Sequence, residues 1–119
     1  MTSDGRFAKK ERLIKTGDFR KVYNKGNSFT VGPFVLKTLP NAFNLSRIGF
    51  SISARSIKRA VRRNRVRRLF REVFRKNKKD IKKGFDMVLL VRKDPQDSFS
   101  YSDAESIFLK LAKKTGVLI

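Results

Sequence analysis

Apolar and polar residues follow one another at helix-like spacing near the start of the chain. Phe19, Val22 and Tyr23 fall at positions i, i+3 and i+4, which predicts one face of a short helix. Thr16 is a candidate N-cap for this helix, and Gly26 is a candidate C′ residue, because these residue types favour those positions.

Three strand-like runs come next. The runs Ser28–Val31 and Phe34–Leu39 are bounded by turn residues, and Arg47–Ser53 alternates between apolar and small polar residues. The two predicted faces of this third run are Ile48, Phe50 and Ile52 on one side, and Gly49, Ser51 and Ser53 on the other. The small, polar face leaves room for a ligand to lie on the sheet, although it is also typical of a solvated face.

A basic segment then predicts the longest helix. Ser56 is a candidate cap, the helix runs to about Lys79, and residues 80–84 turn the chain. At about 100° per residue, the second half of the helix is amphipathic. Its apolar side is formed by Val66, Leu69, Phe70, Val73 and Phe74, and its opposite side by Arg65, Arg68, Arg71 and Arg75.

The first half of this segment breaks the pattern. Its apolar residues, Ile57, Ala60 and Val61, project roughly where the later arginines do, and Arg59, Arg62 and Arg63 project where the later core residues do. The two faces exchange near Asn64. Either the helix is irregular at its start, or its first two turns contact protein on one side and RNA on another.

The last third of the chain predicts a buried strand and a final helix. Phe85–Val91 is almost entirely apolar, as expected for a central strand that is covered on both faces. Asp94-Pro95 ends it, and Ser102–Glu105 has the spacing of a capping box before a helix. The buried stripe of that helix is predicted to be Ile107, Phe108 and Leu111.

The element order is therefore α-β-β-β-α-β-α, which indicates an α+β sandwich with helices packed against one sheet. A chain of 119 residues is long enough for one compact domain, so residues 1–119 are predicted to form a single RNA-binding domain. Residues 1–15 are polar and basic with isolated apolar positions, and we expect an extended arm there.

Charge narrows the class of partner. The net charge is +20, so a polyanion is the natural counterpart, bound tightly and with strong salt dependence. Only half of the basic segment has the pattern of a membrane-surface helix, and it lies mid-chain in a folded-looking sequence. No apolar run approaches the ~18 residues of a membrane span. Without a signal-like N-terminus, the expected location is the cytoplasm. Cys and His are both absent, which removes disulfides and the commonest zinc ligands.

The composition of the basic segment points to RNA. Positions 55–79 hold thirteen Lys or Arg residues, and Glu72 is the only acid among them. A solvated surface usually mixes signs and prefers Lys, whereas the planar fork of Arg suits bidentate phosphate contacts and base stacking. Asn64, between two arginines, is either a tolerated exposed residue or a side chain that orients its neighbours or contacts RNA.

The chain resembles the protein subunit of bacterial ribonuclease P. The resemblance rests on Arg59-Ala60-Val61-Arg62-Arg63-Asn64-Arg65-Val66-Arg67-Arg68-Leu69-Phe70-Arg71-Glu72, because the family has an Arg-Asn-Arg core followed by further basic residues and Arg-Glu. Three other segments agree with the family in consistent order, and the match spans residues 7 to about 93. These segments are Phe7–Leu13, Asp18–Tyr23 with Gly26, and Arg47–Ser53.

The resemblance implies a fold and a function. The family fold is α-β-β-β-α-β-α with a left-handed βαβ crossover. In the family, a large RNA subunit with bound Mg²⁺ hydrolyses precursor tRNA to remove its 5′ leader. The protein binds the catalytic RNA and the leader and strengthens substrate and Mg²⁺ binding. The resemblance therefore implies a non-catalytic subunit, with the catalytic RNA and precursor tRNA as partners, no protein partner required, and no protein ligand assigned to Mg²⁺.

The resemblance also assigns two sets of residues. The set expected to bind the catalytic RNA is Arg59, Arg62, Arg63, Asn64, Arg65, Arg67, Arg68 and Arg71. The set expected to line the cleft for the single-stranded leader is Phe19, Tyr23, Lys37, Ser51, Ser53 and Arg55. Spacing alone would favour core packing for Phe19 and Tyr23, and the resemblance favours stacking on unpaired bases.

Two positions depart from the family pattern. Some members have an aromatic residue where this chain has Lys37, so a phosphate contact could replace a stacking contact. The family often has Lys-Lys after the third strand, where this chain has Ala54-Arg55.

Two other functions compete with this interpretation. A structural ribosomal or RNA-chaperone protein would have similar size and charge. A self-sufficient nuclease would need clustered carboxylates to hold metal ions. The ten acids form no obvious cluster, except that Asp94 and Asp97 share a predicted loop.

Overall fold

The structure is a computed structural model that describes residues 11–12, 16–96 and 98–119. Most of the predicted extended arm, residues 1–15, lies outside these described residues. The elements in chain order are α1 (Thr16–Lys25), β1 (Asn27–Val31), β2 (Phe34–Pro40), β3 (Arg47–Ser51), α2 (Ala60–Asn77), the short 3-10 helix η2 (Lys78–Asp80), β4 (Phe85–Val91) and α3 (Tyr101–Thr115). The predicted order α-β-β-β-α-β-α and the α+β class are confirmed.

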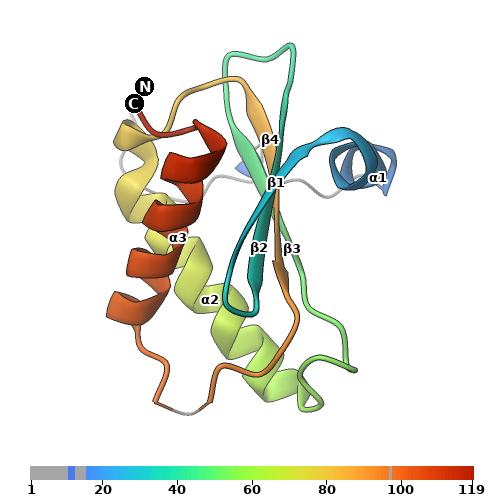
Figure 1. Ribbon diagram of the computed structural model, residues 1–119, viewed down its shortest axis with the longest axis vertical. Coiled ribbons are helices and arrows are strands. Elements are labelled where there is room, and N and C mark those ends of the chain that lie inside the picture. Colours follow the sequence, from blue (N-terminus) through green and yellow to red (C-terminus); the bar gives the residue numbers. More distant parts are fainter. Residues whose placement is uncertain (1–10, 13–15, 97) are drawn as a thin grey trace.

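The four strands form one mixed sheet in the order β1-β2-β4-β3. β2 is antiparallel to both β1 and β4, whereas β3 is parallel to β4 and reaches it through α2. Helices α2 and α3 cover one face of the sheet, and α1 lies against the other (Figure 1). The sheet is therefore covered by two helices on one side and by one short helix on the other.

The main core lies between the sheet and the helices α2 and α3. Phe34, Phe70 and Phe99 pack there with ring centroids 5.4 to 6.0 Å apart. As predicted, Val66, Phe70, Val73 and Phe74 face this core from α2. All of β4 except its first residue is buried, which confirms β4 as a central strand covered on both faces.

The start of α2 differs from the prediction. The helix begins at Ala60, and Ser56 does not cap it. Instead, the backbone amides of Ser56 and Ile57 donate to the carbonyl of Ser53, forming a turn that buries Ile57. The exchange of faces near Asn64 thus reflects an irregular start: the apolar Ile57 reaches the core from a turn rather than from the helix. The strand before the turn also ends at Ser51, two residues earlier than predicted.

The predicted signals at two other helix ends were only partly right. Gly26 directly follows the last residue of α1, as predicted, and its backbone amide donates to the Val22 carbonyl at 2.9 Å, but its φ lies outside the positive range. It allows close packing instead: a Cβ at this position would lie 2.6 Å from the Val22 carbonyl oxygen and 2.8 Å from that of Thr38. The capping box of α3 is formed by Ser100 and Asp103, two residues before the predicted Ser102–Glu105 pair.

Candidate nucleic-acid interface

Helix α1 is fixed to the exposed side of the sheet by a small second core. Val22 is completely buried with Val35, Val88 and Leu90, and Phe19 packs partly buried against this group. In the last turn of the helix, the Tyr23 carbonyl oxygen accepts a hydrogen bond from the Lys37 ammonium group at 3.2 Å. The same ammonium group lies 4.7 Å from the centre of the Tyr23 ring. Both predicted aromatic side chains of α1 therefore meet the sheet, and Tyr23 remains half-exposed.

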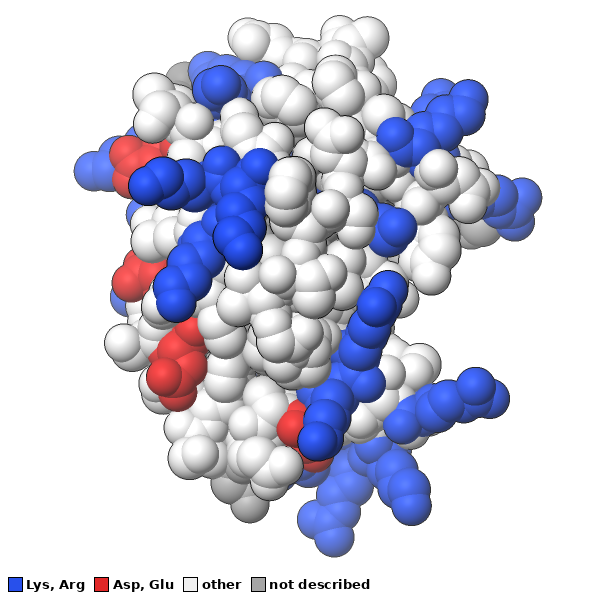
Figure 2. All heavy atoms as spheres, viewed as in Figure 1, with Lys and Arg blue, Asp and Glu red and all other residues white. Residues whose placement is uncertain are grey.

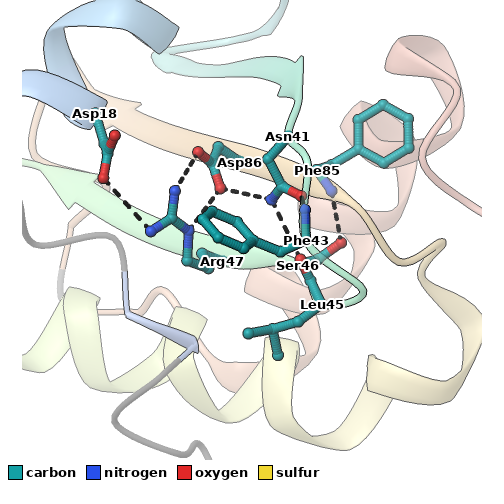
Figure 3. Close-up of polar contacts among 8 residues, drawn as sticks. All are labelled: Asp18, Asn41, Phe43, Leu45, Ser46, Arg47, Phe85 and Asp86. Carbon is teal, nitrogen blue, oxygen red and sulfur yellow. Dashed lines mark hydrogen bonds and ion pairs between the residues drawn. The ribbon is translucent and has the colours of Figure 1, made fainter.

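A polar network ties the first turn of α1 to the sheet (Figure 3). Arg47 on β3 makes two hydrogen bonds to Asp86 on β4, at 2.8 Å from Nε and 2.6 Å from Nη2. Its third nitrogen, Nη1, lies 3.4 Å from Asp18 on α1. These contacts raise the Arg47 pKa, chiefly through the hydrogen bond to Asp86. One guanidinium thus connects α1, β3 and β4.

The strand register places the other predicted cleft residues on this face. Ser51 is opposite Leu90, which is opposite Val35, so Ser51 shares the face of the second core. Lys37 is opposite Val88 and lies on the same face. The structure therefore brings four of the six predicted cleft residues to one face, namely Phe19, Tyr23, Lys37 and Ser51.

The remaining two cleft residues lie beyond the end of β3. The Ser53 hydroxyl accepts a hydrogen bond from the Ser56 amide at 3.1 Å, and Arg55 is exposed in the same turn. In Figure 2 the outline of this side of the molecule is recessed between α1 and the basic side chains that project from the opposite end of the sheet. This recess is the candidate cleft.

Three arginines of the basic motif, all at least partly exposed, make hydrogen bonds to other groups of the protein. Arg62 donates two hydrogen bonds to the Asp94 carboxylate, at 2.8 Å from Nε and 2.6 Å from Nη2. Arg63 donates to the carbonyls of Ile57 and Lys58 at 2.8 and 2.9 Å, and Arg65 donates to the Phe99 carbonyl at 2.8 Å. These contacts hold the turn before α2 and the loop before α3.

The other motif residues are turned outward. Asn64 is exposed and accepts a hydrogen bond from Arg67 at 2.9 Å. Arg59 and Arg68 are exposed. The guanidinium of Arg71 lies 5.9 Å from the centre of the Phe50 ring, and its pKa is lowered by burial and by two nearby arginines, Arg12 and Arg67.

The charge is unevenly distributed over the surface. Figure 2 shows Lys and Arg side chains projecting from the end of the molecule where β3 leads into α2, and acidic side chains mainly beside α3. Among the described residues, no group of three or more Asp or Glu could hold a metal ion. Asp94 is engaged by Arg62, and Asp97 lies outside the described residues. No helix within the described ranges is long and apolar enough to cross a membrane.

Comparison with known proteins settles the family. The model for the family described as Ribonuclease P matches residues 7–116. The chain belongs to the ribonuclease P protein family. It is 37% identical over 110 residues to the ribonuclease P protein component of Clostridium botulinum, covering 92% of this chain and 97% of the relative. It is 38% identical over 114 residues to that of Clostridioides difficile, covering 95% and 98%.

Solved ribonuclease P proteins have the same fold. The protein of Staphylococcus aureus superposes with a TM-score of 0.80 at 28% sequence identity, covering 92% of this chain and 98% of that structure. The protein of Thermotoga maritima gives a TM-score of 0.76 at 33% identity, covering 87% and 98%. Membership makes the chain a component of a tRNA-processing ribonucleoprotein endoribonuclease, with the ribonuclease P RNA as its partner.

Sequence reasoning missed the Arg47–Asp86 network and the loop beside it. An acid inside the apolar run Phe85–Val91 was a usable signal, because a buried carboxylate requires a partner. Nothing in the spacing identified Arg47 as that partner, since the pairing depends on the parallel register of β3 and β4.

Proposed function

We propose that the chain binds the catalytic RNA of ribonuclease P through α2 and the single-stranded 5′ leader of precursor tRNA along the sheet face beneath α1. The observation that carries the proposal is that Phe19, Tyr23, Lys37 and Ser51, drawn from three elements, share one face of the sheet. Aromatic rings stack on unpaired bases of any sequence, and nearby cations contact the backbone phosphates.

The two surfaces meet at one end of the molecule. The turn with Ser53 and Arg55 follows β3 directly and leads into α2. A leader that leaves this turn along β3 would run towards α1, while the catalytic RNA would contact the exposed arginines of α2. Arg59, Arg67, Arg68 and Arg71 supply the direct phosphate contacts in this proposal. Arg62, Arg63 and Arg65 shape the start of the helix through their internal hydrogen bonds.

The RNA subunit and the substrate hold the Mg²⁺ ions that perform the hydrolysis in this proposal. The protein contributes by binding the leader, which raises the occupancy of the substrate beside those ions. It acts as a binding subunit, and the protein alone has no cleavage activity.

Reconstitution tests the proposal. The chain is combined with a bacterial ribonuclease P RNA at low Mg²⁺ concentration, and leader removal from precursor tRNA is followed. We expect the protein to stimulate cleavage and to show none by itself. An RNA that cleaves at the same rate with and without the protein would refute the proposed function, and robust cleavage by the protein alone would support a nuclease instead.

Point variants test the two surfaces separately. Phe19→Ala is expected to weaken binding of precursor tRNA by at least about fivefold, the lower end of base–aromatic stacking, and to leave mature tRNA unchanged. Arg68→Ala, at an exposed arginine of α2, is expected to weaken binding of the RNA subunit. Equal losses for both tRNAs with Phe19→Ala would contradict the cleft.

A further inference from the structure

The loop between β2 and β3 presents an aromatic side chain to solvent. Phe43 lies in this loop, and 55% of its surface is exposed. This fraction is larger than those of Tyr23 and Phe29, which are also exposed. Figure 3 shows its ring beside the guanidinium of Arg47, and the two are 4.7 Å apart from ring centre to Cζ. An exposed ring that rests on a cation is an arrangement suited to binding another flat group.

The loop holds Phe43 in place. The Asn41 side chain accepts a hydrogen bond from the Phe43 amide at 2.8 Å and donates to the Leu45 carbonyl and to Asp86. The backbone N–H of Asn41 donates to the Gly84 carbonyl at 2.8 Å, which ties the loop to the start of β4. A ring fixed in this way loses little conformational entropy when a ligand stacks on it.

A chain of contacts links the Phe43 ring to the helix α1, which carries two aromatic side chains. Tyr23 lies in the last turn of α1 beside Lys37, and Phe19 precedes it by one turn. The next residue towards the start of the helix, Asp18, contacts Arg47, which contacts Phe43. The β2–β3 loop lies at one end of the sheet, and the turn that leads into α2 lies at the other (Figure 1).

We propose that Phe43, backed by Arg47, is an additional stacking site for an unpaired base of the 5′ leader. The inference rests on the proposed function, because it assigns an occupant to one end of the same cleft. In that proposal the catalytic RNA contacts the molecule at the end of the sheet where β3 leads into α2. The cleavage site is therefore placed at this end. Phe43 then binds leader nucleotides that are distant from the cleavage site.

The experiment uses the reconstituted holoenzyme and precursor tRNAs that differ only in leader length. Binding is compared for mature tRNA, a leader of about two nucleotides and a leader of about ten, within the range that single-strand sites cover. Phe43→Ala is expected to weaken binding of the long leader by about fivefold and to leave the short leader and mature tRNA unchanged. Phe43→Leu should behave like Phe43→Ala, and Phe43→Tyr should retain wild-type binding.

Two controls separate stacking from structure. Phe29 is 42% exposed on the edge strand β1, opposite Leu36 and so on the other face of the sheet, and Phe29→Ala should bind every leader like the wild type. Thermal unfolding of Phe43→Leu is measured in parallel, because Leu keeps apolar cover over Arg47 without offering a π-face. A wild-type midpoint together with weakened long-leader binding supports stacking.

Each outcome decides the inference. Wild-type binding of the long leader by Phe43→Ala would overturn the stacking site, and so would an equal loss across all leader lengths. If Phe19→Ala weakens binding of precursor tRNA and leaves mature tRNA unchanged in either case, the proposed cleft stands without the Phe43 site. If the wild-type holoenzyme binds precursor and mature tRNA equally, the proposed cleft itself fails and the Phe43 site fails with it.

Discussion

Asp18 on α1 lies 3.4 Å from Nη1 of Arg47 on β3, and the same guanidinium is bound to Asp86 on β4. The helix that carries Phe19 and Tyr23 is therefore oriented by a residue of the sheet. The Asp18 side chain keeps 30% of its surface exposed, so the ion pair contributes little to global stability, on the order of 1 kcal/mol or less. Its effect should appear in the placement of α1.

We predict that Asp18→Ala weakens binding of precursor tRNA about two- to threefold, because α1 is held less firmly over the sheet and stacking loses well under 1 kcal/mol. Affinity for the RNA subunit should not change by the same factor. Fluorescence titration of the holoenzyme with precursor and mature tRNA measures the change in tRNA affinity. Asp80→Ala, at an exposed acid of η2, makes the same change in net charge and serves as the control. Equal effects of the two variants would mean that charge alone is responsible.

The Arg47–Asp86 pair should matter much more for folding. Arg47→Met leaves the Asp86 carboxylate, which is only 9% exposed, without its main partner. We expect a loss of about 3 kcal/mol in the free energy of unfolding, because an unpaired buried charge is costly. Urea unfolding measures the loss. The double variant Arg47→Met/Asp86→Leu should recover part of it, and a double variant less stable than Arg47→Met would contradict this account.

Acid should weaken the contact between α2 and the loop before α3. The hydrogen bond from Arg62 holds the pKa of Asp94 below its usual value. Within α2 itself, the hydrogen bond from Arg75 likewise holds the pKa of Glu72 below its usual value. A depressed carboxyl pKa adds stability above the unfolded-state pKa, and this stability is lost as the pH falls through the folded-state pKa. Stability should therefore drop as the pH falls below about 4, where unfolded Asp and Glu side chains titrate. Asp94→Asn should flatten that decline in urea unfolding, and Asp94→Asn/Glu72→Gln should flatten it further.

Two glycines of the α1 region should respond oppositely to alanine. A Cβ at Gly26 would meet two backbone carbonyl oxygens that cannot move independently, so Gly26→Ala should destabilise the protein and displace α1. A Cβ at Gly17 meets nothing within 4 Å, and Gly17 is the second residue of α1. Gly17→Ala should therefore be neutral or stabilising by about 0.5 to 1 kcal/mol, the helix propensity difference. Thermal unfolding of the pair measures this, and similar midpoints would refute the role given to Gly26.

The elements that the sequence predicted well are those set by local periodicity. β4 was recognised from an unbroken apolar run, and the apolar side of α2 from its helical spacing. The errors lie where tertiary contacts override local signals. Ser56 has the residue type of a cap, but Ile57 is buried in a turn that delays the helix to Ala60.

The candidate site was predictable only as a set of residue types. The motif identified a basic surface, but it could not separate arginines that bind within the protein from those that face outward. That separation depends on partners distant in the sequence, such as Asp94 for Arg62 and the Phe99 carbonyl for Arg65. The presence of Phe19, Lys37 and Ser51 on one face likewise depends on strand register.

The separation of the arginines can be measured through salt dependence. Arg68 is exposed on α2, and we expect it to neutralise one RNA phosphate. Arg68→Ala should therefore reduce the slope of log affinity against log salt for the RNA subunit by about one, with an unchanged unfolding midpoint. The charge of Arg62 is already matched by Asp94, so Arg62→Ala should lower the unfolding midpoint and change the slope by much less. If the two variants reduce the slope equally, Arg62 leaves Asp94 to bind RNA, and the assignment of Arg62 to an ion pair within the protein is wrong.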